Sequence, residues 1–199
     1  GGTWRERMAF DDNAVLELPT GVDIEQASML CVNPFTVMGM LEGIPTGATI
    51  VLNSATSAVS RLVLSVCRQR GIAAVAVVRD LRAEPDLRER GAVAVLLDGD
   101  DLAQRVAQIA PTPVVRGLDA VAGTASGRLY DCIAEGGDLL IYGLIASDRV
   151  DLPAARLVFR DVTIRGFSRL RIFAAMSPSR RQAITQELVR LLADGTLHA

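Results

Sequence analysis

Apolar positions follow two different periods along this chain, and both are clear between residues 48 and 80. ATIVLN is an apolar and β-branched run of strand length, and Ile72 to Val78 is a second such run. Between them, apolar residues from Ser57 onward recur at helical spacing as far as Gly71, the residue type that ends helices in the left-handed conformation. The stretch therefore predicts a β-α-β unit whose strands are buried on both faces of a parallel sheet.

The same pattern, a glycine at the end of a helical segment followed by an apolar run, recurs further along the chain. RQRG precedes IAAVAVV, RERG precedes AVAVLL, and AEGG precedes DLLIYG. A helix that ends in glycine and leads directly into an apolar strand is typical of an α/β fold, here a doubly wound parallel six-stranded Rossmann sheet with helices on both faces. The predicted strands, of which the third is expected to be buried, are residues 48–53, 72–78, 92–97, 118–122, 139–142 and 162–167. The predicted helices between and after them are residues 57–70, 81–90, 100–109, 123–135 and 177–193.

The first 22 residues do not resemble the start of a domain. TWRERMAF and AVLELP are short strand-like pieces around a turn at residues 11–13, and they are too poor in apolar residues for a core of their own. Two helices are predicted next. One runs from Glu25 to Leu30 after a cap at Asp23 or Thr20, and the other begins at Asn33-Pro34. Residues 1–22 are therefore expected to be an extension or a fragment beside the main domain.

Composition and charge exclude several classes of function. The formal net charge of the 199 residues is -2, which argues against a general nucleic-acid or anionic-membrane binder. No apolar run approaches the ~20 residues of a membrane span, and no signal peptide is recognised. Cys31, Cys67 and Cys132 are widely separated in apolar segments, as expected for free thiols in a reducing cytosol. We therefore expect a cytoplasmic protein that binds neither nucleic acid nor membrane.

The chain is also poor in groups that could do chemistry unaided. Its single histidine, His198, is next to the last residue, so a Ser-His-Asp or Cys-His mechanism has no suitable base. No pair of cysteines or histidines has the spacing of zinc ligands. Any reaction is therefore expected to depend on a bound cofactor or on a segment outside this sequence, and no metal is expected.

The turn after the first strand is a candidate phosphate-binding site. A dinucleotide site usually has a glycine-rich turn here, but NSATSAVS, residues 53–60, contains no glycine. Its short side chains still permit a close approach, and the hydroxyls of Ser54, Thr56 and Ser57 could donate to a phosphate at the helix N-terminus. The alternative is a tight packing turn that binds nothing.

Arg79 favours the first interpretation. It stands at the end of the second strand, 22 positions after Ser57, where an acidic residue would suit the ribose of NAD and an arginine suits the 2′-phosphate of NADP. Arg82 could add a second cation, while Asp80 could orient Arg79 or cap the next helix. The alternative is an ordinary solvated arginine. An S-adenosylmethionine methyltransferase would require an acidic residue in place of Arg79.

At this point a resemblance to a known family is recognisable. VNPFTVMGML, NSATSAVSRLVL, VAVVRD, DAVAG, IYG and RDVTIRGF, in that order, resemble segments of the medium-chain dehydrogenase/reductase superfamily. They are most similar to its zinc-free branch, the mitochondrial-type trans-2-enoyl-thioester reductases and their quinone-reductase-like bacterial relatives. The resemblance covers nearly the whole chain from Thr3.

The resemblance implies NADPH as cofactor and two subunits paired through residues 162–167 as a homodimer. It places Asn33 and Thr36, within N-P-x-T, at the active-site cleft. Three departures stand out: Ala58 and Ser60 replace glycines of the phosphate turn, Val37-Met38 replaces Ala-Tyr, and family members are much longer. The strand ends and the resemblance together give the predicted cofactor-binding residues, which are Asn53, Thr56, Ser57, Ala58, Val59, Arg79, Arg82, Ala122, Gly123, Tyr142, Gly143, Gly166 and Phe167.

The length difference gives the expected domain organisation. Residues 1–22 would be the remnant of an N-terminal catalytic, GroES-like domain, and residues 23–199 would form the Rossmann NADPH-binding domain. The tyrosine that donates the proton in this family would then precede Gly1, so the catalytic residue is unknown. The predicted function is NADPH-dependent reduction of the C=C bond of an α,β-unsaturated thioester. The alternatives are reduction of a quinone or another activated alkene, and a non-catalytic dinucleotide-binding or dimerisation module.

Overall fold

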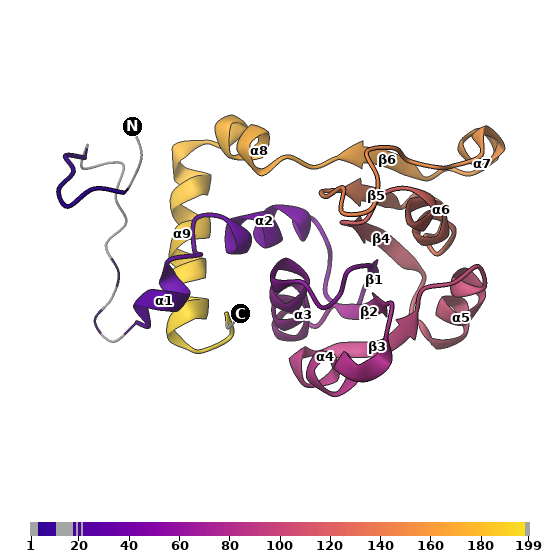
Figure 1. Cartoon of the computed structure of the whole chain (residues 1–199), viewed down its shortest axis with the longest axis horizontal. Helices are drawn as coiled ribbons and strands as arrows, with labels where there is room; N and C mark the ends of the chain where they lie inside the picture. The colour runs from indigo at the N-terminus through magenta and orange to yellow at the C-terminus, as the bar shows by residue number, and fades with distance from the viewer. Residues whose placement is uncertain (1–3, 11–17, 19, 21, 198–199) are drawn as a thin grey trace.

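The structure is a computed structural model that describes residues 4–10, 18, 20 and 22–197. One sheet of six parallel strands, in the order β3-β2-β1-β4-β5-β6, runs through the described part of the chain (Figure 1). This confirms the predicted six-stranded parallel sheet. The strands are β1 (Thr49–Leu52), β2 (Ala73–Val78), β3 (Ala92–Leu97), β4 (Val114–Asp119), β5 (Asp138–Ile141) and β6 (Thr163–Gly166).

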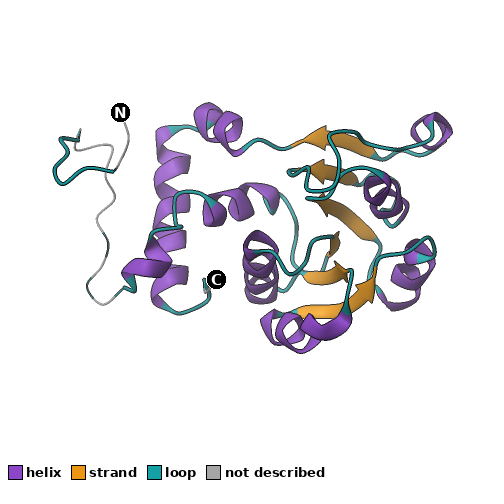
Figure 2. Ribbon diagram, viewed as in Figure 1, coloured by secondary structure: helices purple, strands orange, loops and turns teal. Residues whose placement is uncertain are grey.

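Helices cover both faces of the sheet (Figure 2). One buried cluster joins α2, α3, α4 and α9 to the sheet, and a second joins α5 and α6 to its opposite face. The predicted doubly wound arrangement is therefore confirmed. The helices are α1 (Ile24–Ala27), α2 (Asn33–Met40), α3 (Ala58–Arg70), η2 (Leu81–Ala83), α4 (Glu84–Arg90), α5 (Leu102–Ile109), α6 (Thr124–Asp131), α7 (Ala154–Phe159), α8 (Arg169–Ala175) and α9 (Pro178–Ala193).

The central strands β1 and β2 are almost entirely apolar because they are covered on both sides. In β1, Ile50 and Leu52 lie in the cluster with α3, whereas Val51 lies in the cluster with α5 and α6. The connecting helix α3 has the predicted ends. The Ser57 hydroxyl accepts a hydrogen bond from the Ser60 N–H, and Gly71 closes the helix with a φ of 65°.

The fourth strand was predicted too late in the chain. It begins at Val114, directly after Pro113, and ends at Asp119 instead of running from 118 to 122. The apolar run after Asp119 has the composition of a strand. The Asp119 carboxylate, however, accepts hydrogen bonds from the Val121 and Ala122 N–H groups, and the chain forms a turn there. Ala122 has a φ of 65°, so Ala122-Gly123 lies in a loop beyond the strand end. The next helix is also shorter than predicted, at Thr124–Asp131.

Three further expectations near the edges were wrong. β3 is not fully buried, because it pairs only with β2 and leaves Val93 and Leu97 exposed. The first helix ends at Ala27 instead of Leu30, although Asp23 caps it as predicted. Residues 4–10 form no strand, whereas residues 11–17 and 19, which carry the predicted turn and most of AVLELP, lie outside the described residues.

Candidate functional site

All the predicted cofactor residues lie at or after the carboxyl ends of strands, or at the start of the helix that follows β1. Because all six strands are parallel, these ends share one edge of the sheet. The strand order reverses direction between β1 and β4, which is the point where open α/β sheets bind their ligands. The structure therefore brings the predicted residues to one edge of the sheet, with β1, β2 and β3 on one side of the switch point and β4, β5 and β6 on the other, and this region is called the crevice below.

The glycine-free turn between β1 and α3 exposes backbone donors. Ala58 is exposed and Val59 half-buried, and as the first two helical residues neither N–H has an intrahelical partner. The Thr56 side chain is exposed beside them. Ser57 differs from expectation, because its hydroxyl accepts from the Ser60 N–H and donates to the Ser60 Oγ at 3.0 Å. The Ser57 hydroxyl is therefore engaged within the turn, whereas Thr56 and the two N–H groups remain open to an anion.

The backbone of this turn also has a feature that sequence reasoning missed. Ser54 has a φ of 49°, the left-handed region in which glycine is unstrained and other L-residues pay a cost. The sequence comparison with the family placed the missing glycines at Ala58 and Ser60, both of which are helical. The residue whose conformation calls for glycine is instead Ser54.

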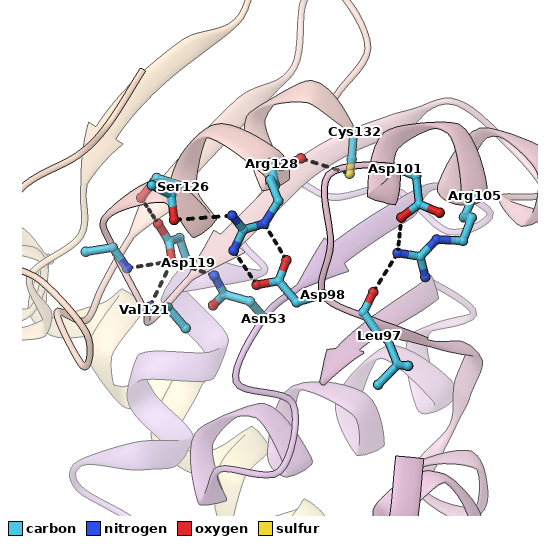
Figure 3. Close-up of polar contacts among 12 residues, drawn as sticks. Asn53, Leu97, Asp98, Asp101, Arg105, Asp119, Val121, Ser126, Arg128 and Cys132 are labelled. Atoms are coloured by element: carbon cyan, nitrogen blue, oxygen red, sulfur yellow. Dashed lines mark hydrogen bonds and ion pairs between the residues drawn. The ribbon is translucent and has the colours of Figure 1, made fainter. Parts of the chain in front are cut away.

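Asn53 holds the two halves of the crevice together (Figure 3). It is 4% exposed, its Nδ2 donates to Asp119 Oδ1 at 2.6 Å, and its Oδ1 accepts the Ala120 N–H at 2.8 Å. The fully buried Asp119 carboxylate also accepts a hydrogen bond from the Ser126 hydroxyl. The amide of Asn53 is thus engaged by the protein on both sides, and Asn53 positions the turn instead of presenting its side chain to a ligand.

Asp119, Ser126 and a second pair nearby were not predicted as site residues. Asp98, which follows β3, accepts two hydrogen bonds from Arg128 of α6, at 2.7 and 2.6 Å (Figure 3). This bidentate pair ties the end of the outermost strand to the far side of the crevice. Thirty positions separate the two residues, and no local pattern in the sequence links them.

Arg79 lies exposed just beyond the end of β2. It makes no hydrogen bond or ion pair with any other residue of the described ranges, so its guanidinium is available to an incoming anion. Arg82 is different, because its Nε donates to Asp80 Oδ2 at 2.6 Å. Asp80 also accepts the Arg82 N–H and so caps the next helical turn, as predicted, and these hydrogen bonds lower the pKa of Asp80.

The end of β5 packs closely against the phosphate turn. The Tyr142 hydroxyl lies 3.3 Å from the Ser60 Oγ, and burial raises the pKa of the phenol. Gly143 follows, and a Cβ at this position would lie 2.6 Å from the Ala120 carbonyl oxygen. Only glycine fits between the loops after β4 and β5, because the close atoms belong to the backbone.

The last predicted residues differ in exposure. Gly166, at the end of β6, is exposed and has open space around it. Phe167 is half-buried and packs against α2, where its ring would lie 3.0 Å from a Cβ at Gly39. Asn33 and Thr36 are half-buried near the start of α2, and the Thr36 hydroxyl donates to the Val32 carbonyl at 2.8 Å. Phe167 and α2 thus form an apolar contact next to the end of β6.

The described residues do not fit a zinc ion. They contain no group of three or more histidine, cysteine or acidic side chains that could hold a metal. Burial raises the pKa of the Cys67 and Cys132 thiols to about 12, so neither is a thiolate ligand or nucleophile near neutral pH.

The described part of the chain also has open cavities away from this edge of the sheet. Within the described part of the chain, no helix has the length and apolar character needed to cross a bilayer. An open cavity of about 450 Å³ lies between α3 and α4, and others of about 440 and 380 Å³ lie at the amino edge of the sheet and between α5 and α6. None of the three is lined by a predicted site residue.

Comparisons with known proteins point in one direction. A family model described as zinc-binding dehydrogenase matches residues 58–193. The mitochondrial enoyl-[acyl-carrier-protein] reductase of Caenorhabditis elegans is 30% identical over 204 residues, covering 98% of this chain and 58% of the relative. The human protein of the same name is 28% identical, covering 100% of this chain and 56% of the relative. The chain therefore spans little more than half the length of these relatives.

Solved structures agree in fold. A putative NADPH:quinone reductase from Bacillus thuringiensis superposes with a TM-score of 0.85 at 20% identity, covering 95% of this chain and 58% of the other. The complex of Etr1p with NADP and crotonyl-CoA gives 0.80 at 20% identity, covering 90% and 53%. The Etr1p/Etr2p heterodimer of Candida tropicalis also gives 0.80 at 20% identity, covering 91% and 54%.

These relatives correct one expectation. A cytoplasmic location was predicted from the free cysteines, but the curated relatives are named as mitochondrial proteins. Free thiols persist in any reducing compartment, so cysteine usage alone could not identify the compartment.

Proposed function

Because the chain belongs to the zinc-binding dehydrogenase family, we propose that it is the cofactor-binding part of an NADPH-dependent reductase acting on the C=C bond of an α,β-unsaturated thioester. Its resemblance to the zinc-free enoyl and quinone reductases of the medium-chain superfamily is confirmed. The curated relatives are named as enoyl reductases, and the Etr1p complex contains NADP and crotonyl-CoA. The observation that carries the proposal is Arg79, an exposed cation without a partner among the described residues, at the end of β2.

The residues of this chain bind and orient the cofactor. The N–H groups of Ala58 and Val59 and the hydroxyl of Thr56 would hold the pyrophosphate, since the positive end of α3 lies behind them. Arg79 would bind the 2′-phosphate, with Arg82 adding a second, partly neutralised cation. Gly166, which has open space around it, would leave room for the nicotinamide at the end of β6, and Ala122, Gly123 and Gly143 would line the ends of β4 and β5 beside it.

When bound, NADPH supplies the hydride for the β-carbon of the thioester. The substrate would lie beside Asn33 and Thr36, with Phe167 and α2 excluding water from one side. We assign the proton donor to no residue of this chain. Residues 23–199 would form the cofactor domain, with residues 1–22 as the remnant of a preceding catalytic domain.

Calorimetric titration of NADPH and NADH tests the cofactor assignment. Arg79→Ala should raise the Kd for NADPH about 10- to 100-fold, since a charge-assisted phosphate contact contributes about 1.5–3 kcal/mol. The Kd for NADH should change little, because NADH lacks the 2′-phosphate. Arg82→Ala is the matched comparison, and its effect should be smaller because Arg82 is already paired with Asp80. Equal losses for both nucleotides would contradict the assignment of Arg79.

Reduction of a quinone or another activated alkene is the second candidate, favoured by the fold match to the quinone reductase of Bacillus thuringiensis. Turnover of crotonyl thioester against a quinone, with NADPH and the complete protein, separates the two. A complete protein that binds NADPH but turns over neither would instead be a non-catalytic binding or dimerisation module.

We further propose a homodimer that forms through β6. Within the described chain this strand pairs only with β5, so its other edge is open. Beside it, α7 exposes Val158 (72%) and Phe159 (81%), while Arg156 of the same helix is tied to Asp131 at 2.9 Å. A helix held by an ion pair that still presents apolar side chains suits an interface. Sedimentation should give a dimer for the chain and a monomer for Phe159→Arg, and a monomer in both cases contradicts the proposal.

A further inference from the structure

The loop that follows β3 is strongly acidic and lies next to Arg79. Residues 98–101 read Asp-Gly-Asp-Asp and come directly after Leu97, the last residue of β3. The Asp98 N–H donates to the Val78 carbonyl at 2.8 Å, so the backbone of residue 98 lies beside that of residue 79. Because neighbouring strands are about 4.8 Å apart, a carboxylate without a partner here would be within reach of the Arg79 guanidinium.

The alternation of the two strands directs residues 79 and 98 to the same face of the sheet. In β2, Val77 lies in the buried cluster with α5 and α6, and in β3, Leu96 packs against the same cluster. Side chains two positions apart in a strand share a face, so Arg79 and Asp98 follow on this face. The contact of Asp98 with Arg128 of α6 agrees with this assignment. Two opposite charges are therefore neighbours at the ends of β2 and β3.

Arg79 nevertheless has no ionic partner among the described residues, because Arg128 binds the carboxylate of Asp98. The Arg128 Nε and Nη2 donate to the two Asp98 oxygens at 2.7 and 2.6 Å (Figure 3), and Nη1 donates to the Thr124 hydroxyl at 3.2 Å. The hydrogen bonds and charge of Asp98, with a smaller contribution from Asp100, raise the pKa of Arg128. Both Asp98 oxygens are thus engaged on the side of α6.

The other arginine beside the acidic loop is engaged as well. Arg105 Nη2 donates to Asp101 Oδ1 at 2.7 Å and to the Leu97 carbonyl at 2.8 Å (Figure 3). If Arg128 were absent, Asp98 would therefore find its new partner in Arg79, at the end of the neighbouring strand.

We propose that Arg128 is a positioning residue that holds Asp98 away from Arg79, and so sets the preference for NADPH over NADH. The proposal rests on the proposed function and adds the side chain on which cofactor selectivity depends. A released Asp98 would pair with Arg79 and place a negative charge where the 2′-phosphate of NADPH binds. NADH carries a hydroxyl at this position, and a carboxylate can accept a hydrogen bond from it. The loss of Arg128 should therefore affect NADPH alone.

Calorimetric titration of both nucleotides tests the selectivity. Arg128→Gln should raise the Kd for NADPH about fivefold or more and leave the Kd for NADH unchanged. The double variant Arg128→Gln with Asp98→Asn should recover the affinity for NADPH, because no carboxylate remains to compete. Arg190→Gln is the matched control, since it also removes one arginine from an ion pair, the exposed pair with Asp194 on α9, and it should change neither Kd. Equal losses for both nucleotides, or no recovery in the double variant, overturn the proposal.

Chemical modification of Arg79 tests the same coupling without a nucleotide. Phenylglyoxal reacts with guanidinium groups that are accessible and not held in an ion pair, and mass spectrometry locates the modified residue. Arg79 should react more slowly in Arg128→Gln than in the wild type, and at the wild-type rate in the double variant. The same rate in all three proteins overturns the proposal. A wild type that binds neither nucleotide refutes the proposed function, while the modification of Arg79 still decides whether Arg128 holds Asp98 away from it.

Discussion

The Asn53–Asp119 contact is the most testable structural element of the crevice. Asp119 is fully buried, and its carboxylate accepts hydrogen bonds from Asn53, Ser126 and the N–H groups of Val121 and Ala122. Asp119→Ala would leave these donors without their acceptor. A buried unsatisfied donor costs about 1–3 kcal/mol, and since water can reach part of the loop, the total should be about 3–5 kcal/mol.

A milder variant and a control show how the loss of stability depends on the hydrogen bonds of Asp119. Asp119→Asn keeps one oxygen toward three of the donors, and its new N–H faces the Ser126 hydroxyl, which can rotate to accept it. This variant should lose only the charge-assisted part of the bonds, about 1–2 kcal/mol. Asp148→Ala is the matched control, because Asp148 is exposed in the neighbouring loop after β5, and its effect should stay within about 0.5 kcal/mol.

The assay is urea unfolding of the chain followed by circular dichroism. The midpoint should fall in the order Asp148→Ala, Asp119→Asn, Asp119→Ala, with an unchanged slope. Because the total stability of a domain is only about 5–15 kcal/mol, the largest effect should be obvious. If Asp119→Ala lies within about 1 kcal/mol of the control, Asp119 does not hold the crevice together and the reasoning fails.

Four further predictions follow from the same edge and from the thiols. Gly143→Ala should destabilise the chain by about 1–3 kcal/mol in thermal unfolding, because its Cβ would lie 2.6 Å from the Ala120 oxygen, whereas Gly166→Ala, in open space, should not. Tyr142→Phe should weaken NADPH binding about threefold to tenfold by calorimetry with stability reduced by ~1 kcal/mol, because it removes the contact with Ser60; an unchanged Kd would refute the link. The raised pKa values of Cys67 and Cys132, about 12, should leave exposed Cys31 as the fast-reacting thiol toward a thiol reagent. Cys67 also stays protonated when folded, so unfolding becomes easier as the pH rises from about 9 toward 12, and a stability that is flat over this range would contradict its burial.

The sequence predicted the fold well because its signals are local and repeated. Each unit places a Gly-ended helix directly before an apolar run, and Ser57 and Gly71 bound α3 as expected. The errors occurred where a tertiary contact overrides the local pattern. DAVAG has the composition of a strand, but the Asp119 side chain accepts hydrogen bonds from the Val121 and Ala122 N–H groups, which in a strand would pair with a neighbouring strand. Similarly, β3 has the composition of a buried strand but lies at the edge of the sheet, because the hydropathy of a strand does not determine its place in the strand order.

The edge of the sheet at which the candidate residues lie was predictable from the sequence, whereas the contacts of their side chains were not. Parallel strands place all their carboxyl ends at one edge, so Thr56, Arg79, Gly143 and Gly166 could be assigned to a common crevice. Which side chains are free could not be deduced, because this depends on partners distant in sequence. Asn53 is engaged by residues more than 60 positions away, and Arg82 is paired with Asp80, whereas Arg79 has no partner in the described part of the chain.

In the glycine-free turn, hydrogen bonds within the protein would keep the backbone N–H groups accessible, as the glycines do in a glycine-rich turn. A glycine-rich turn lets the backbone approach phosphate because it lacks side chains and adopts positive φ. Here Ser54 adopts the positive φ, and Asn53 fixes the turn to the loop after β4. The Ser57 and Ser60 hydroxyls turn inward toward each other and toward Tyr142, so they do not occupy the approach to Ala58 and Val59. The two N–H groups therefore remain open without glycine, since hydrogen bonds inside the protein hold the small side chains out of the way.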